Sequence, residues 1–238
     1  MSEKLQFDDK ILFSGGLSPS QTFSENGHAP RAPLQLPMKI LALELSTARG
    51  SLAWLDTQTE EERDWPNDRK NSSAFFENVD SITKKFGAPD RIIVGLGPGS
   101  YAGTRIAISA AIGLHVASGA RLIGYPSICA FANAAEYCVI GDARRKSFFF
   151  ARVAGNDLIE GPTLLFASEL HQKIGNLDSR LAIFCSEPLP QFERAVTAYP
   201  SARTLVRLAH EPQRSFSLPP LEPIYLREPH ITMPKTGT

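Results

Sequence analysis

Residues 91–119 read RIIVGLGPGSYAGTRIAISAAIGLHVASG, and this stretch decides the fold. Residues 91–95 carry a branched apolar run bounded by turn-forming residues, which predicts a short inner strand. A glycine-rich turn follows, and Ser100 or Thr104 can cap the helix that begins after it and ends at Gly119. Apolar residues occupy nearly all sides of this helix and many others are small, so we expect it to have neighbours on more than one side.

The glycine turn has two interpretations. Backbone amides at a helix N-terminus attract anions, which makes Gly97, Gly99, Ser100, Gly103 and Thr104 candidates for an anion or nucleotide cleft. The alternative is a tight strand-to-helix corner without a ligand. The spacing fits neither the Walker A nor the Gly-x-Gly-x-x-Gly pattern, and the proline at position 98 breaks the Gly-x-Ser-x-Gly pattern. Both interpretations stay open at the level of sequence.

The composition is typical of a globular protein with a substantial core. Lysine plus arginine equals aspartate plus glutamate at 25 each, so an RNA role would need a partner or a local basic patch. The three cysteines (Cys129, Cys138 and Cys185) form no Cys-x-x-Cys pair, which predicts buried free thiols. No stretch approaches the roughly 20 apolar residues of a membrane span, so we expect a cytoplasmic protein.

We expect three regions along the chain. Residues 1–37 are rich in proline and glycine without apolar periodicity, which predicts a disordered extension, and residues 38–131 and 132–238 then form two α/β lobes. Each lobe is expected to begin with an antiparallel meander, with strands at 39–45, 51–56 and 57–65, and at 137–142, 147–154 and 158–166. Further strands are expected at 121–125 and 181–185. Helices are expected at 72–86, 127–135, 168–174, 190–198 and 201–210. Residues 218–226 are expected to return to the first lobe.

Four blocks of sequence carry a family resemblance. They are KILALELSTARGSLAWLD (39–56), GLGPGSYAGTRIAISAAIGLHVASGARLIG (95–124), GDAR (141–144) and EPIYLR (222–227). In this order they resemble the signature blocks of the TsaB family, also called YeaZ, and the resemblance covers about residues 38–230. It implies a duplicated ribonuclease H-like α/β fold with two lobes, the architecture of the actin and Hsp70 ATPase superfamily.

The resemblance also implies a role without catalysis. The TsaB family serves the machinery that makes N6-threonylcarbamoyladenosine in tRNA, as dimerisation partner and activator of the transferase TsaD. TsaE is then a partner through the complex with TsaD, tRNA is met only indirectly, and a homodimer is an alternative assembly. No cofactor is expected, although weak ATP or ADP binding at a shared interface is left open.

Two observations on the residues agree with a noncatalytic role. The five histidines (His28, His115, His171, His210 and His230) are too scattered to form the His-x-x-x-His pair with which the catalytic relative holds its metal, so no metal site is expected. Glu44 stands where the family usually has an aspartate near the nucleotide cleft. Asp142 remains as a cleft candidate beside Arg144, and capping of the following turn is its alternative role.

The resemblance places the partner interface on the first two helices of the first lobe. The candidate interface residues are Phe75, Phe76, Val79, Ile82, Ile108, Ala111, Ile112 and His115. Burial in the core is the alternative for any of them, because one face of each helix must be core. We expect Ala111 and Ile112 to face outward and Ile106 to face inward.

Two other functions are alternatives. The first is an ATP-dependent small-molecule phosphotransferase of the same fold, which would need phosphate-binding turns in both lobes and a carboxylate pair for metal. Only the first lobe shows a convincing glycine turn. The second is a peptidase, for which the sequence offers neither a Ser/His/Asp order nor metal-ligand spacing.

Overall fold

The first lobe is built on a five-stranded mixed sheet. The computed structural model describes residues 38–67, 72–131 and 135–227. In this lobe the elements are β1 (Ile40–Glu44), β2 (Arg49–Leu55), β3 (Glu60–Pro66), α1 (Ser73–Phe86), β4 (Arg91–Gly95), α2 (Tyr101–Ser118) and β5 (Arg121–Tyr125). The strand order is β3-β2-β1-β4-β5, with β1 to β3 antiparallel and β4 and β5 parallel to β1. The predicted meander, central strand and following helix are confirmed.

The second lobe repeats this plan. The short helix η1 (Ser127–Ala130) ends the first lobe, and the elements that follow are β6 (Glu136–Asp142), β7 (Ser147–Ala154), β8 (Asp157–Phe166), α3 (Ala167–Gly175), β9 (Ala182–Cys185), β10 (Ala195–Thr197) and α4 (Ala202–His210). The sheet order is β10-β9-β6-β7-β8. Counted from the first strand of each lobe, both sheets have the order third, second, first, fourth, fifth. The expected duplicated ribonuclease H-like α/β fold is confirmed.

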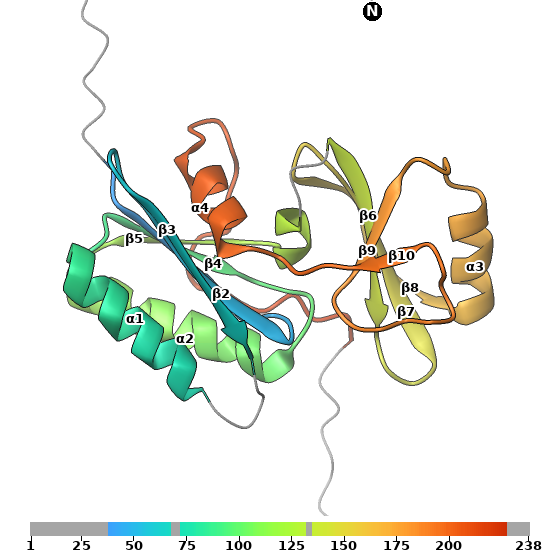
Figure 1. Ribbon diagram of the computed structural model, residues 1–238, viewed down its shortest axis with the longest axis horizontal. Coiled ribbons are helices and arrows are strands. Elements are labelled where there is room, and N and C mark those ends of the chain that lie inside the picture. Colours follow the sequence, from blue (N-terminus) through green and yellow to red (C-terminus); the bar gives the residue numbers. More distant parts are fainter. Residues whose placement is uncertain (1–37, 68–71, 132–134, 228–238) are drawn as a thin grey trace, which may run out of the picture. The chain divides into compact units, whose positions relative to one another are not determined.

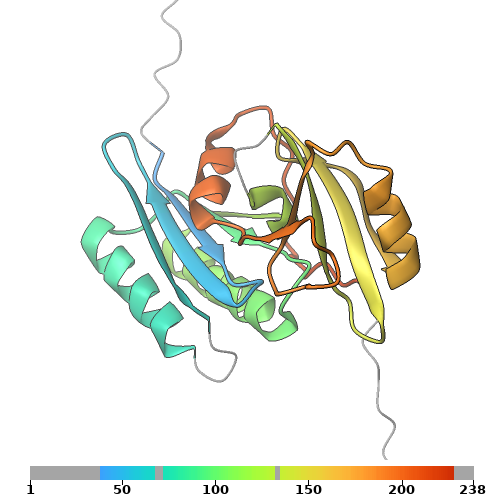
Figure 2. The same ribbon diagram turned by 45° about the vertical axis from the view of Figure 1, so that its right-hand side comes forward.

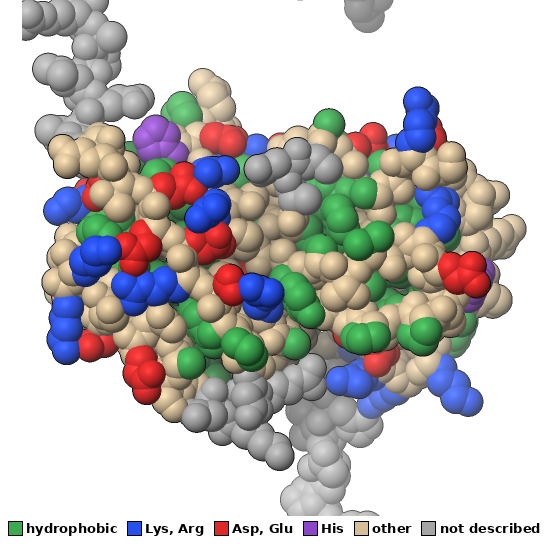
Figure 3. Space-filling model, in the orientation of Figure 1, with side chains coloured by type: hydrophobic (Ala, Val, Ile, Leu, Met, Phe, Trp, Pro, Cys, Tyr) green, Lys and Arg blue, Asp and Glu red, His purple; other side chains and the backbone are tan. Residues whose placement is uncertain are grey.

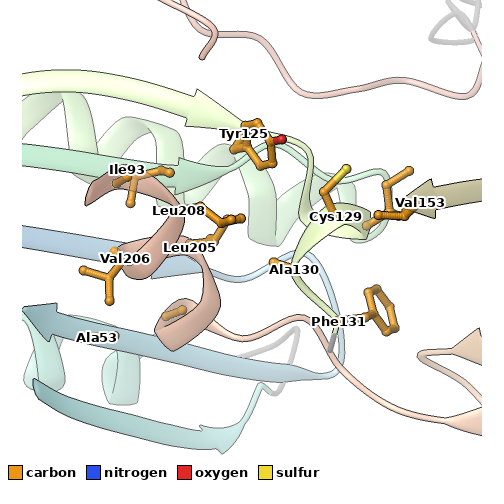
Figure 4. Packing of buried hydrophobic residues seen from close by; sticks show 14 of the residues in the cluster. Ala53, Ile93, Tyr125, Cys129, Ala130, Phe131, Val153, Leu205, Val206 and Leu208 are labelled. Atoms are coloured by element: carbon orange, nitrogen blue, oxygen red, sulfur yellow. The ribbon is translucent and has the colours of Figure 1, made fainter. Parts of the chain in front are cut away.

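Each sheet is covered in part by a segment that follows the other sheet. Helices α1 and α2 lie on one face of the first sheet, and α4, which follows the second sheet in the chain, lies on the opposite face (Figures 1 and 2). The short helix η1 follows the first sheet and contacts β7 and β8. The result is one shared hydrophobic cluster, in which Ile93 of the first sheet, Val153 of the second and Leu205 of α4 all take part (Figure 4).

Helix α4 is amphipathic, and both of its faces are used. Its apolar face buries Leu205 and Val206, which are fully inaccessible to solvent. Its polar face carries arginines that pair with glutamates of β3. Arg207 donates to Glu60 over 2.7 Å, and Arg203 lies 3.2 Å from Glu62. The helix is therefore held on the first sheet by packing and by charge.

The predicted helix at 190–198 is wrong. Residues 190–194 form turns, and β10 then pairs in parallel with β9. Phe192 packs into the core of the second lobe, and the Arg194 guanidinium donates to the carbonyl of Ile174 over 2.8 Å. These tertiary contacts fix a non-helical backbone. The helix expected at 127–135 is also shorter than expected: η1 ends at Ala130 and residues 132–134 lie outside the described residues.

The extension predicted at 1–37 and the last residues, 228–238, also lie outside the described part of the chain. Before that end, residues 217–224 contact the first lobe. Ser217 forms an antiparallel bridge with Gly124, and the Ile224 amide donates to the Leu96 carbonyl over 2.8 Å. Among the described helices, none has the length and apolarity that crossing a bilayer requires.

Candidate functional site

The glycine turn packs directly against the chain that joins β1 to β2. A Cβ atom on Gly99 would lie 2.1 Å from the Ser46 carbonyl oxygen, and one on Gly103 would lie 2.1 Å from the Leu45 carbonyl oxygen. Real Cβ atoms do not approach an oxygen so closely. Gly97 has a φ of 84°, which disfavours any residue with a side chain. Glycine is therefore required here by backbone contact.

Several amides of the turn donate to other protein atoms. Leu96 donates to the Tyr125 carbonyl over 2.9 Å, Gly97 to the Ser127 hydroxyl over 2.9 Å, and Ser100 to the Ser46 carbonyl over 2.5 Å. Ser100 is the helix cap, and its hydroxyl accepts from Gly103 over 3.3 Å. Thr104 lies inside the first turn of α2, where its side chain is buried, so Thr104 is not the cap. These contacts favour a structural corner over an anion site.

Glu44 is a buried carboxyl group beneath the turn. Its side chain has no exposed surface, and Oε1 accepts from the Ser46 amide over 2.6 Å. Oε2 points at Gly95 and accepts no well-aligned hydrogen bond from the described residues, although the hydroxyls of Ser46 and Ser127 lie beside the carboxyl. Burial raises the pKa of Glu44 above its ordinary value of 4.5, and the neighbouring hydroxyls oppose this only in part. The carboxyl does not face an open cleft in this structure.

Asp142 caps a turn. Its Oδ1 accepts from the Arg144 amide over 2.7 Å, and its Oδ2 lies 3.3 Å from Arg144 Nη1. The Asp142 amide donates to Glu187 Oε1 over 2.6 Å. Every one of these contacts shapes the connection from β6 to β7, so the structure supports the capping role for this residue.

The described residues hold no cluster of three or more histidine, cysteine, aspartate or glutamate side chains that could bind a metal. His115 Nδ1 lies 2.6 Å from the Ala120 carbonyl oxygen at the end of its own helix. The cysteines are free and buried, as predicted, and burial raises the pKa of Cys129 to about 12 and of Cys138 to about 11. Such thiols are poor nucleophiles at neutral pH.

Most of the candidate interface residues belong to the core. The structure buries five of them in the cluster under α1 and α2: Phe75, Val79, Ile82, Ile108 and Ala111. These five are corrected to core residues. Ala111 was expected to face outward and is fully buried, whereas Ile106, expected inward, is half-buried. These two predictions were wrong because α2 is apolar on nearly all sides, so its sequence does not mark an inner face. The buried face is set instead by the packing of Ala107, Ile108 and Ala111 against the sheet.

An apolar surface remains on these helices. Phe76 of α1 is 50% exposed, and Ile112 of α2 is 44% exposed. Val116, one turn beyond Ile112, is 77% exposed and was not among the candidates. Its spacing of four residues from Ile112 was the signal that could have identified it. We call Phe76, Ile112 and Val116 the helical apolar surface.

The chain is similar to known proteins in sequence and in fold. The family model described as "TsaD: tRNA N6-adenosine threonylcarbamoyltransferase" matches residues 73–219. A solved structure described as an uncharacterized protein with similarity to peptidase YeaZ from Pseudomonas aeruginosa aligns at 22% identity with a TM-score of 0.65, over 80% of this chain and 100% of that chain. YeaZ from Pseudomonas aeruginosa aligns at 22% identity with a TM-score of 0.57, over 72% and 90%. Comparison with curated proteins gives no match. The two structures show that the fold is that of YeaZ.

Proposed function

Since this chain belongs to the TsaD family of tRNA N6-adenosine threonylcarbamoyltransferases, we propose that it acts in tRNA threonylcarbamoyladenosine modification as a noncatalytic subunit that binds and activates TsaD. TsaE joins through this complex. tRNA reaches the chain within the same assembly.

The helical apolar surface carries this proposal. A buried apolar side chain contributes about 1.5 to 3 kcal/mol to stability, so a pair of exposed apolar side chains on one helix face is typical of a binding site. Val116 and Ile112 lie one helical turn apart, and Gly113 between them lets another backbone approach closely. A helix or helical pair of TsaD fits such a surface better than a polar ligand does.

Three features of the candidate residues support the noncatalytic part of the proposal. The Glu44 carboxyl is enclosed and its pKa is raised, so it is a poor metal ligand in this conformation. Amides of the glycine turn are engaged by protein atoms, and Asp142 is engaged in its own turn. The residues that a phosphotransferase would use are therefore occupied with holding the fold.

Charge substitution on the helical apolar surface tests the proposal. We expect Ile112→Glu and Val116→Glu to give folded chains that bind TsaD at least roughly thirtyfold more weakly, because an interface residue of this kind contributes about 2 kcal/mol or more. Val196→Glu is the matched control, because Val196 is 59% exposed on β10 of the second lobe. The measurement is size-exclusion chromatography with light scattering, with each variant alone and mixed with TsaD.

Four results would change the proposal. Full complexes with both helical variants would contradict the interface, and equal losses with Val196→Glu would show that the effect is general. A loss of self-association without a loss of TsaD binding would assign the surface to a homodimer. Metal-dependent ATP turnover by the purified chain would contradict the noncatalytic role and favour the phosphotransferase.

A further inference from the structure

The connection from β6 to β7 has an unusual backbone. Arg144, Arg145 and Lys146 have φ values of 64°, 53° and 60°, three consecutive left-handed residues that carry side chains. The other described residue of this kind is Asn156, and asparagine tolerates this conformation better than arginine or lysine does. Backbone strain of this sort persists only where the surrounding structure fixes it, and it concentrates at functional sites.

The base of the turn is fixed by hydrogen bonds. The Ala143 amide donates to the Ser147 carbonyl over 2.9 Å, and the Ser147 amide donates to the Arg144 carbonyl over 3.1 Å. The Asp142 carboxylate accepts from the Arg144 amide, and the side chains of Ala143 and Ser147 are buried. The strained backbone therefore holds the three long side chains of residues 144–146 away from the sheet.

The turn concentrates positive charge on the surface. All three residues from 144 to 146 are exposed. Arg144 lies 3.3 Å from Asp142, whereas Arg145 and Lys146 form no ion pair with any described residue. The nearby Glu187 carboxylate already accepts from the Asp142 amide and from the Ser186 hydroxyl. Figure 3 shows Lys and Arg side chains protruding below the lower end of the second sheet, where β6 ends and β7 begins.

We propose that residues 144–146, which we call the basic turn, bind the phosphate backbone of tRNA. The choice of tRNA as the ligand rests on the proposed function. The chain has no net charge, so any RNA contact must come from a local patch of this kind. A protruding turn fits an RNA backbone, which proteins recognise by shape and by phosphate contacts, better than it fits a mononucleotide, which needs a concave pocket.

The test is the salt dependence of tRNA binding to the full chain, measured by fluorescence anisotropy. The variant is Arg145→Asn with Lys146→Asn, because asparagine keeps the left-handed backbone and removes both charges. The matched control is Lys84→Asn with Arg180→Asn, which removes the same charge from two exposed cations that are paired with Asp80 and Asp178. Both double variants are also mixed with TsaD and analysed by size-exclusion chromatography.

We expect the basic-turn variant to lower the slope of log K against log salt by about one unit per lost phosphate contact. If the two phosphate contacts contribute nothing to binding at about 1 M salt, their loss lowers the tRNA affinity of the basic-turn variant at about 0.1 M salt roughly 25- to 60-fold. The control keeps the wild-type slope, and both variants still coelute with TsaD.

Three results would overturn the inference: an unchanged slope in the basic-turn variant, an equal loss in the control, or displacement of tRNA by ATP from the wild type alone. Failure to coelute with TsaD in the wild type would instead contradict the proposed function, while a reduced slope in the basic-turn variant would still support RNA binding by this turn.

Discussion

Replacing a glycine of α2 by alanine should have opposite effects on stability at two positions of the helix. Gly103 lies in the first turn of the helix, where an added Cβ would stand 2.1 Å from the Leu45 carbonyl oxygen. Gly113 lies further along the same helix, where an added Cβ would meet no atom of the described residues within 4 Å apart from its own helical neighbours. The two alanine variants therefore share their chemistry and their helix, and they differ in what the new methyl group contacts.

The size of each effect follows from these contacts. In Gly103→Ala the helix or the β1–β2 connection must move by about 1 Å, because both groups in conflict are attached to backbone. Overpacking of a core costs about 1 to 3 kcal/mol, and a conflict with backbone belongs at the upper end. Gly113→Ala gains about 0.8 to 1.0 kcal/mol from helix propensity. The two variants should differ by roughly 4 kcal/mol in the free energy of unfolding, the sum of these effects.

Thermal and urea unfolding of the chain alone measure both effects. For a domain of about 200 residues, 1 kcal/mol moves Tm by about 2 to 4 °C. We expect Tm to fall by roughly 6 to 12 °C in Gly103→Ala and to rise by roughly 2 to 4 °C in Gly113→Ala. Equal Tm values for Gly103→Ala and the wild type would refute the close packing of the glycine turn on the connection between β1 and β2.

Two further predictions concern buried polar groups. Burial raises the pKa of Glu44 above 4.5, so the native chain binds the proton of this carboxyl more tightly than the unfolded chain does. The protonated Glu44 therefore contributes fully to the free energy of unfolding below pH 4.5. This contribution falls as pH rises from 4.5 toward the raised pKa. Glutamine does not ionise, so Glu44→Gln should not lose stability in this way. In urea unfolding, the stability of the variant relative to the wild type should therefore increase from pH 4.5 upward, and a difference independent of pH would contradict the buried carboxyl. The Arg214 side chain is 10% exposed and donates to Tyr125 over 2.8 Å and to Asp157 over 2.6 Å. Arg214→Met should lower the free energy of unfolding by about 2 to 3 kcal/mol, and a loss below about 1 kcal/mol in urea titrations would show that this network is dispensable.

The sequence predicted elements that depend on local signals. Strand β4, the glycine turn and the end of α2 at Gly119 follow from an apolar run and from glycine punctuation, which act within a few residues. Helix α1 followed equally well, because Phe75, Val79 and Ile82 recur at helical spacing among polar residues. The spacing did not tell whether these three side chains face the core or a partner, and their assignment to the interface was wrong.

The remaining features depend on contacts between distant segments. Helix α2 is apolar on nearly all sides, so its own sequence cannot tell that Ala111 is buried and Val116 is exposed. Phe192 and Arg194 prevent a helix because of partners far along the chain. No pattern of residue types predicts that the glycine turn encloses Glu44. The same holds for the left-handed backbone at residues 144–146.

The exchange of covering segments between the lobes has a consequence for synthesis. All five strands of the first sheet have been made once Tyr125 leaves the ribosome, yet α4 is complete only at His210, roughly 85 residues later. At about 5 to 20 residues per second, one apolar face of that sheet waits on the order of 4 to 17 seconds for its cover. Ile40, Ala42 and Ile93 are on that face, and all three are fully buried in the finished molecule. The nascent chain thus exposes an apolar surface for far longer than a loop takes to close. The first lobe is therefore the part of the chain that a chaperone would bind.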